Sequence, residues 1–151
     1  RLGYAYPNGL YNADVAAAVA SRFDHARTIN AVTDIIGHAS RYALGGVSAY
    51  PELEQATLEL LIDRAAEGGE WLTVVFHLFS PEPEVDTQFP PERFESLLDH
   101  ALASGITVMT TSEAWRWNLT VAVCGVNQPG LAELTPGSAS EAGVDCSLTA
   151  N

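Results

Sequence analysis

The stretch Trp71-Leu72-Thr73-Val74-Val75-Phe76-His77-Leu78-Phe79 decides how the rest of this sequence is interpreted. It is apolar almost throughout, with Gly68-Gly69 before it and Ser80-Pro81 after it. A short run of β-branched and aromatic residues is typical of a strand buried on both faces of a parallel sheet. His77 is the one ionisable residue in this run and lies near its carboxyl end, where parallel-sheet proteins carry their chemistry. The position of His77 in the strand is equally compatible with a site residue and with a core histidine that makes one hydrogen bond.

Short strands and helices alternate along the first three quarters of the chain. Besides the central stretch, the patterns predict strands at 2–6, 23–29 and 106–110, and helices at 13–22, 51–68, 91–104 and 113–117. Such alternation indicates βαβ units and a parallel sheet. The expected fold class is therefore α/β, a partial (β/α) barrel of parallel strands over residues 1–117. Residues 118–151 lose all periodicity and are expected to form a linker or a small appended segment.

Four strands with four helices amount to half of a closed barrel. Half a barrel leaves two apolar edges unpaired, and unpaired edges favour aggregation. We therefore expect the natural protein to continue upstream of Arg1, or two copies of the chain to pair.

Composition narrows the possible partners. The 151 residues carry a net charge of −12, and all seven basic residues are arginine. Such a surface would repel nucleic acid and anionic membranes, so we expect neither as a partner. A neutral or cationic ligand is compatible with it. No apolar run approaches the length of a membrane span.

The two cysteines, Cys124 and Cys146, both lie in the C-terminal part. A disulfide between them would stabilise the fold by roughly 3 kcal/mol on the chain-entropy model. It would also indicate an oxidising compartment. Two free thiols remain the alternative.

Several segments line up in a familiar order. Ala5-Tyr6-Pro7-Asn8-Gly9 closes the first strand, Val75-Phe76-His77 ends the central one, and Thr110-Thr111-Ser112-Glu113-Ala114-Trp115 opens the last helix. With Asn12–Val15, Ala26–Thr28 and Asp99–Ala101 between them, this order resembles the second half of the polysaccharide deacetylase family. That family is the NodB-homology domain, carbohydrate esterase family 4. The resemblance covers roughly residues 2–115.

The resemblance implies a distorted TIM-like barrel that removes N- or O-acetyl groups from glycans with a divalent metal, expected to be zinc. The family's metal-binding aspartate and histidines, and its catalytic base, belong to motifs that this sequence lacks. No metal ligand is therefore assigned here, and the chain is expected to be inactive alone. His77 matches the general acid that protonates the leaving group, a task suited to an imidazole. Asn8 matches the residue whose backbone N–H holds the oxyanion.

Other matches are less direct. Asp34 is a candidate to orient His77, with an exposed loop carboxylate as the alternative. Tyr6 and Trp115 are candidates to stack on a sugar, with packing as the alternative for Trp115. The family has tyrosine where this chain has Asn8, and often arginine where it has Ala5. By contrast His25, beside Asp24, is expected at the surface.

Two functions follow as hypotheses. The first is metal-dependent deacetylation of an acetylated poly- or oligosaccharide, in an extracellular or cell-envelope setting, by an enzyme of which this is the C-terminal half. The second is a non-catalytic carbohydrate-binding or structural module with the same barrel. The sequence upstream of Arg1 would separate the two, because the metal and base motifs belong there.

Overall fold

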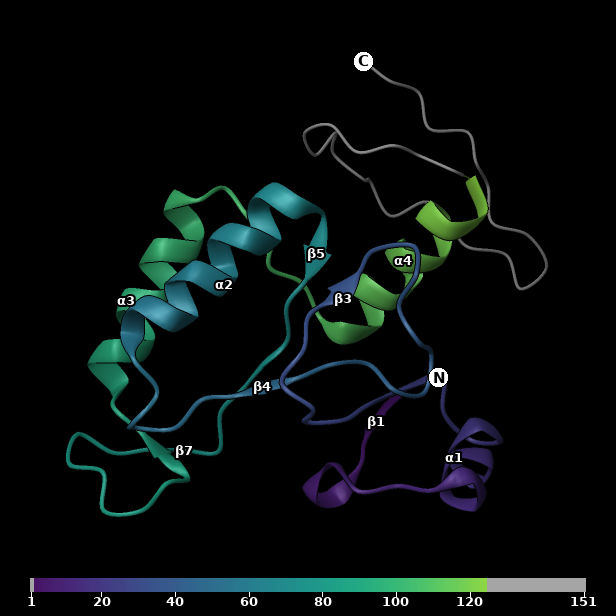
Figure 1. The fold of residues 1–151 in the computed structure, drawn as a ribbon, viewed down its shortest axis with the longest axis horizontal. Helices are drawn as coiled ribbons and strands as arrows, with labels where there is room; N and C mark the ends of the chain where they lie inside the picture. The colour runs from purple at the N-terminus through teal and green to yellow at the C-terminus, as the bar shows by residue number, and fades with distance from the viewer. Residues whose placement is uncertain (1, 125–151) are drawn as a thin grey trace.

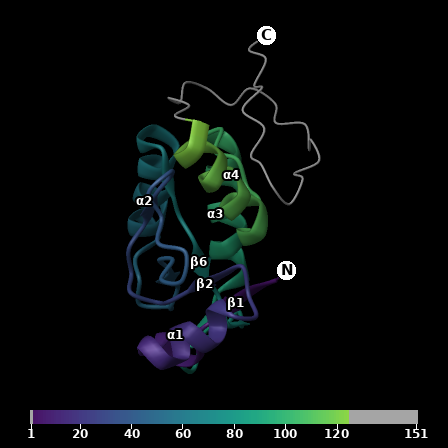
Figure 2. The same cartoon turned by 90° about the vertical axis from the view of Figure 1, so that its right-hand side faces the viewer.

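The structure is a computed structural model that describes residues 2–124. Figure 1 shows two groups of elements. In one, helices α2 (Gln55–Gly68) and α3 (Pro91–Ala103) pack along each other. In the other, strand β1 (Gly3–Ala5) leads through the short helical turn η1 (Pro7–Gly9) to helix α1 (Ala13–Ala20), and helix α4 (Thr111–Cys124) lies above β1. Figure 2 places α1 at the opposite end of the molecule from the end of α4.

The strands are short and pair two by two. Three pairs are parallel: β1 with β2 (His25–Arg27), β4 (Val47–Ser48) with β6 (Val74–Val75), and β7 (Leu78–Phe79) with β8 (Gln88–Phe89). The fourth pair, β3 (Asp34–Ile35) with β5 (Glu70–Trp71), is antiparallel. The pairs form four separate two-stranded sheets in the described residues, and none of them closes. The partial barrel therefore stays a prediction.

Backbone contacts connect two of the parallel pairs. Arg27 forms an isolated parallel bridge with Leu44, and the amide of Thr28 donates to the carbonyl of Leu44 at 2.8 Å. Leu44 is followed by Gly45 and Gly46 and then by β4, and the amide of Ala49 donates to the carbonyl of Val75 at 3.0 Å. β1, β2, the segment 44–48 and β6 thus run parallel, neighbour to neighbour, so that their carboxyl ends lie along one edge.

The prediction of one doubly buried strand over residues 71–79 is wrong. The stretch is divided among β5, β6 and β7, and each piece pairs with a different neighbour. Leu78 and Phe79 are 57% and 49% exposed, and His77 is exposed as well. The alternative of a buried core histidine is thereby also wrong for His77.

Two further expectations differ from the structure. Residues 106–110 form no strand, and α4 runs through the predicted boundary at residue 117 as far as Cys124. Of the two cysteines in the predicted disulfide, Cys146 lies outside the described residues. None of the helices in residues 2–124 has the length and apolar character needed to span a bilayer.

The molecule has two apolar clusters. The larger one is centred on Leu58, Phe89 and Leu97, and brings α2, α3, β4 and β8 together. The smaller one joins Tyr6, Val19 and Ala26, which packs α1 against one face of the β1–β2 pair. The opposite face of β1–β2 carries Gly3, Ala5, His25 and Arg27, because strand residues alternate between faces.

Candidate functional site

Asn8 lies just after the carboxyl end of β1. Its backbone is left-handed, with φ 52° and ψ 20°, a conformation that asparagine tolerates better than most residues. The turn is held by the amides of its neighbours: Gly9 donates to the carbonyl of Tyr6 at 2.9 Å, and Leu10 to that of Pro7 at 3.1 Å. Asn8 is exposed, and its own amide has no acceptor among residues 2–124. A backbone N–H is therefore free to donate to a ligand here.

His77 occupies the corresponding place two residues after β6. Its side chain is exposed and makes no hydrogen bond or ion pair within the part of the chain that the structure describes. Since β1 and β6 belong to the same parallel array, His77 and Asn8 both follow strand ends on one edge of the molecule.

Asp34 is not paired with His77 in the described chain. Its Oδ2 accepts a hydrogen bond from the amide of Gly45 at 2.8 Å, and its residue partner across β3–β5 is Trp71. Burial raises the pKa of Asp34, and the hydrogen bond from Gly45 partly opposes that rise. Asp34 is half-buried, so it is not the exposed loop carboxylate of the alternative either.

Tyr6 and Trp115 are buried, at 3% and 6% exposure. The Tyr6 hydroxyl donates to the carbonyl of Tyr42 at 3.1 Å, and burial raises the pKa of Tyr6. The Trp115 ring stacks near His25, with 6.3 Å between ring centroids. Neither ring has a free face that could stack on a sugar in this structure. Both side chains are packed in the interior.

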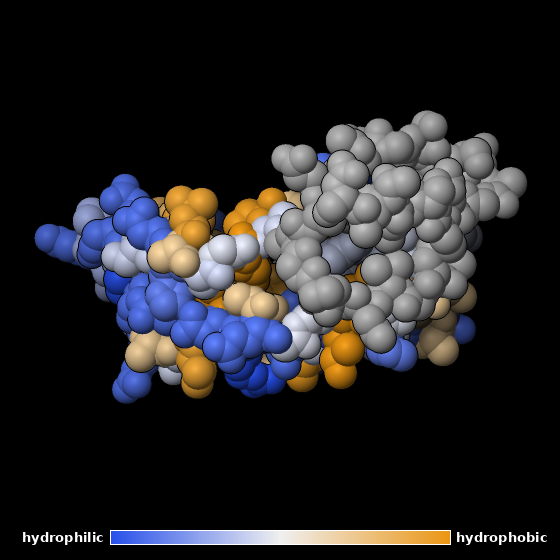
Figure 3. Space-filling view, turned by 90° about the horizontal axis from the view of Figure 1, so that it is seen from above, coloured by the Kyte–Doolittle hydropathy of each residue, from blue (hydrophilic) through white to orange (hydrophobic). Residues whose placement is uncertain are grey.

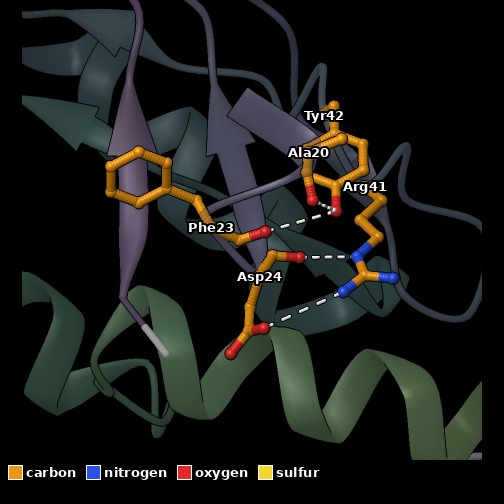
Figure 4. Close-up of polar contacts among 5 residues, drawn as sticks. All are labelled: Ala20, Phe23, Asp24, Arg41 and Tyr42. Carbon is orange, nitrogen blue, oxygen red and sulfur yellow. Dashed lines mark hydrogen bonds and ion pairs between the residues drawn. The ribbon is translucent and has the colours of Figure 1, made fainter. Parts of the chain in front are cut away.

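The segment around Tyr42 is tied to the end of α1 and the start of β2. Figure 4 shows the Tyr42 hydroxyl directed at the carbonyls of Ala20 and Phe23, at 3.5 and 3.3 Å. Arg41 donates from Nε to the carbonyl of Asp24 at 2.5 Å, and its Nη2 lies 3.9 Å from the Asp24 carboxylate. These contacts fix the loop that covers Tyr6.

His25 is the residue that sequence reasoning missed. It was expected at the surface, but it is buried at 2% exposure, and neither ring nitrogen has a hydrogen-bond partner among the described residues. Burial lowers the pKa of His25; Arg41 and Arg116 lower it further, while Asp24 opposes them. The available signal was strand alternation, which places His25 on the same face as Arg27.

No group of three or more His, Cys, Asp or Glu side chains that could hold a metal ion occurs in residues 2–124. The described residues do not fit a metal site, and no chemical step is derived through a metal. Comparisons with protein-family models, with curated proteins and with solved structures find no match to this chain.

Proposed function

We propose that this chain is the C-terminal half of a metal-dependent deacetylase that acts on an acetylated poly- or oligosaccharide. One observation carries the proposal: a free backbone N–H at Asn8 and an unpartnered imidazole at His77 both follow parallel strands on one edge. The order of sequence motifs supports it independently. The metal, expected to be zinc, and the base would be supplied by residues outside this chain.

The proposed chemistry divides between two groups of this chain. Water attacks the acetyl carbonyl carbon, and the resulting oxyanion accepts a hydrogen bond from the Asn8 amide. His77 then donates a proton to the leaving nitrogen or oxygen as its bond to the acetyl carbon breaks. The products are acetate and a free amine or hydroxyl on the glycan. An imidazole is the side chain most often used as a general acid in such a step.

Exposed apolar residues support the need for another polypeptide. Leu102 and Val108 are 75% and 72% exposed, and Leu78 on β7 is also exposed. Large exposed apolar surfaces mark places where another chain or segment packs. In the proposal, the missing half of the barrel or a second copy covers them.

An extracellular or cell-envelope location is part of the same proposal, because glycan substrates of this kind are found there.

The test is deacetylation of an acetylated chito-oligosaccharide by the complete protein, compared with a His77→Ala variant. Loss of one positioned proton donor should lower turnover by about 100- to 10,000-fold and leave substrate binding nearly unchanged. Metal content, measured in parallel, should not change. His38→Ala is the matched control, because His38 is exposed but lies on another loop.

A second variant tests the Asn8 amide. Asn8→Gly keeps the backbone N–H and tolerates the left-handed backbone, so it should retain turnover.

Near-normal turnover in His77→Ala would remove His77 from the mechanism. Loss of metal in that variant would make His77 a ligand instead, and the proposed division of roles would fail.

The alternative is a non-catalytic carbohydrate-binding or structural module. It is favoured by one observation: the carboxylate of Asp34 is engaged by Gly45 and does not orient His77. Such a module would bind the oligosaccharide without releasing acetate, and the same assay separates the two functions.

A further inference from the structure

A cleft opens between the β1–β2 pair and the start of α4. Its volume is ≈ 300 Å³, the lower end of roughly 300–1,000 Å³ for small-molecule sites. Gly3, Ala5, His25 and Arg27 line it from the strands, and Thr111 and Ser112 line it from the helix.

The helix supplies two free backbone donors. α4 is 14 residues long, and Thr110 and Glu113 cap it reciprocally: the Thr110 amide donates to Glu113 Oε2 at 2.8 Å, and the Glu113 amide donates to Thr110 Oγ1 at 3.3 Å. This pairing leaves the amides of Thr111 and Ser112 without an acceptor among the described residues. Amides in the first turn of a helix favour an anion, because the helix dipole has its positive end there.

Arg27 adds a cation to the same cleft. It is half-buried, and the one hydrogen bond that its side chain makes within residues 2–124 runs to the neighbouring carbonyl of Thr28 at 3.4 Å. Although the sequence holds 19 acidic residues, no carboxylate within the described chain forms an ion pair with Arg27. A half-buried guanidinium is normally paired with an anion, and a bound carboxylate would supply that partner for Arg27.

His25 is the second, independent indication of a ligand. It lines the cleft, it is 2% exposed, and neither of its ring nitrogens has a partner in residues 2–124. Its Nε2 lies over Gly3, so near that a β carbon built on Gly3 would stand 2.3 Å away. Buried polar groups normally have a hydrogen-bond partner, and these two nitrogens, which lie beneath the lining of the cleft, have none in residues 2–124.

We propose that this cleft binds a carboxylate. Its two oxygens would accept hydrogen bonds from the Arg27 guanidinium and from the amides of Thr111 and Ser112, with the imidazole of His25 beside them. A singly charged anion is favoured over a doubly charged one, because the Glu113 carboxylate is already placed at the same helix end. The cleft is lined by neither Asn8 nor His77, and the proposal does not depend on the deacetylase function.

Binding of sodium acetate to the full chain tests the proposal, in carboxylate-free buffer at constant ionic strength. Amide chemical shifts should report saturable binding at Thr111 and Ser112, and calorimetry should give the affinity. Arg27→Gln should weaken acetate by about tenfold or more, the usual effect of losing a charge-assisted hydrogen bond. Thr111→Pro removes one donor at a helix position where proline is tolerated, and should weaken acetate too. Arg22→Gln is the control, because Arg22 is an exposed arginine at the end of α1.

Two further ligands identify the source of the carboxylate. If D-glucuronate binds more tightly than acetate while neutral N-acetylglucosamine does not bind, the ligand is an acidic sugar. If acetate and glucuronate bind equally, a carboxylate alone is recognised. Either result supports the site. The proposal is overturned if no shift saturates, if both variants bind acetate as tightly as the unchanged chain, or if sulfate binds more tightly than acetate.

Discussion

His25 shows how the neighbour opposite a residue, and not its own polarity, decides whether it is buried. Across β1–β2 it faces Gly3, which has no side chain, and Trp115 packs beside it. Asp24, next to it in sequence, is partly exposed and contacts Arg41. The imidazole is thus buried without the hydrogen bonds that would favour its charged form.

The stability of the fold should therefore depend on pH through His25. Its pKa in the folded state is below the ordinary value of 6.5, so the unfolded chain binds the proton more readily. Above pH 6.5 the imidazole is neutral in both states, and His25 does not lower the free energy of unfolding. As the pH drops from 6.5 toward the folded-state pKa, the free energy of unfolding should fall.

Urea unfolding at a series of pH values checks this expectation. A His25→Phe variant should lose that part of the pH dependence, while His38→Phe, at an exposed position, should keep it. The raised pKa of Asp34 acts with the opposite sign, so it does not mimic the effect. Parallel pH profiles for the unchanged chain and His25→Phe would contradict the prediction.

The candidate site could be predicted from sequence only as far as order along the chain. Asn8 and His77 do follow parallel strands, because motif order and strand direction are both local in sequence. The environment of each side chain could not be predicted, since it depends on distant residues: Gly45 engages Asp34, and Tyr42 covers Tyr6.

At the scale of elements, helices were easier to predict than strands. α1 and α3 begin at residues 13 and 91, as predicted, and Gly105, with φ 71°, follows the end of α3, where glycine is favoured. α2 begins at Gln55 and not at Pro51. The two-residue strands β3, β4 and β8 leave no periodic signal, because their stabilisation comes from a partner far away in the chain.

Helix α1 offers a test of local stabilisation. It is eight residues long and buries only Val19, so its stability depends strongly on its first turn. The Asn12 side chain accepts from the amide of Val15 at 2.9 Å. Asn12→Ala should lower the free energy of unfolding by about 1 kcal/mol, and Asn12→Gly by only a few tenths.

Urea unfolding of both variants, with Asn12→Ser as the control that keeps a capping oxygen, measures the difference. Hydrogen exchange of the α1 amides should rise in the same order. Equal stability of Asn12→Ala and Asn12→Ser would show that the cap contributes nothing.

At the scale of the whole molecule, charge and apolar exposure oppose each other. Figure 3 shows apolar patches set among polar groups on the face seen from above. The net charge of −12 repels one copy from another, while exposed Leu102 and Val108 favour contact.

We therefore expect the chain to self-associate, and more strongly at high salt, because salt screens the repulsion and leaves apolar contact intact. Sedimentation at several concentrations and salt levels measures this. Leu102→Lys and Val108→Lys should each weaken association, despite lowering the repulsive net charge. Ala66→Lys, the same charge change at an exposed position of α2, is the control. A monomer at every salt level would contradict the expectation.

The close approach of Gly3 to His25 also constrains the order in which this sequence can evolve. A methyl group at position 3 would meet the imidazole 2.3 Å away, so a larger residue there requires the His25 side chain to move or to be replaced by a smaller one. A smaller residue at position 25 would remove this clash, so a substitution of His25 would favour a later substitution of Gly3. The two positions should therefore change together, and because both line the cleft, each such change would also alter what the cleft can hold.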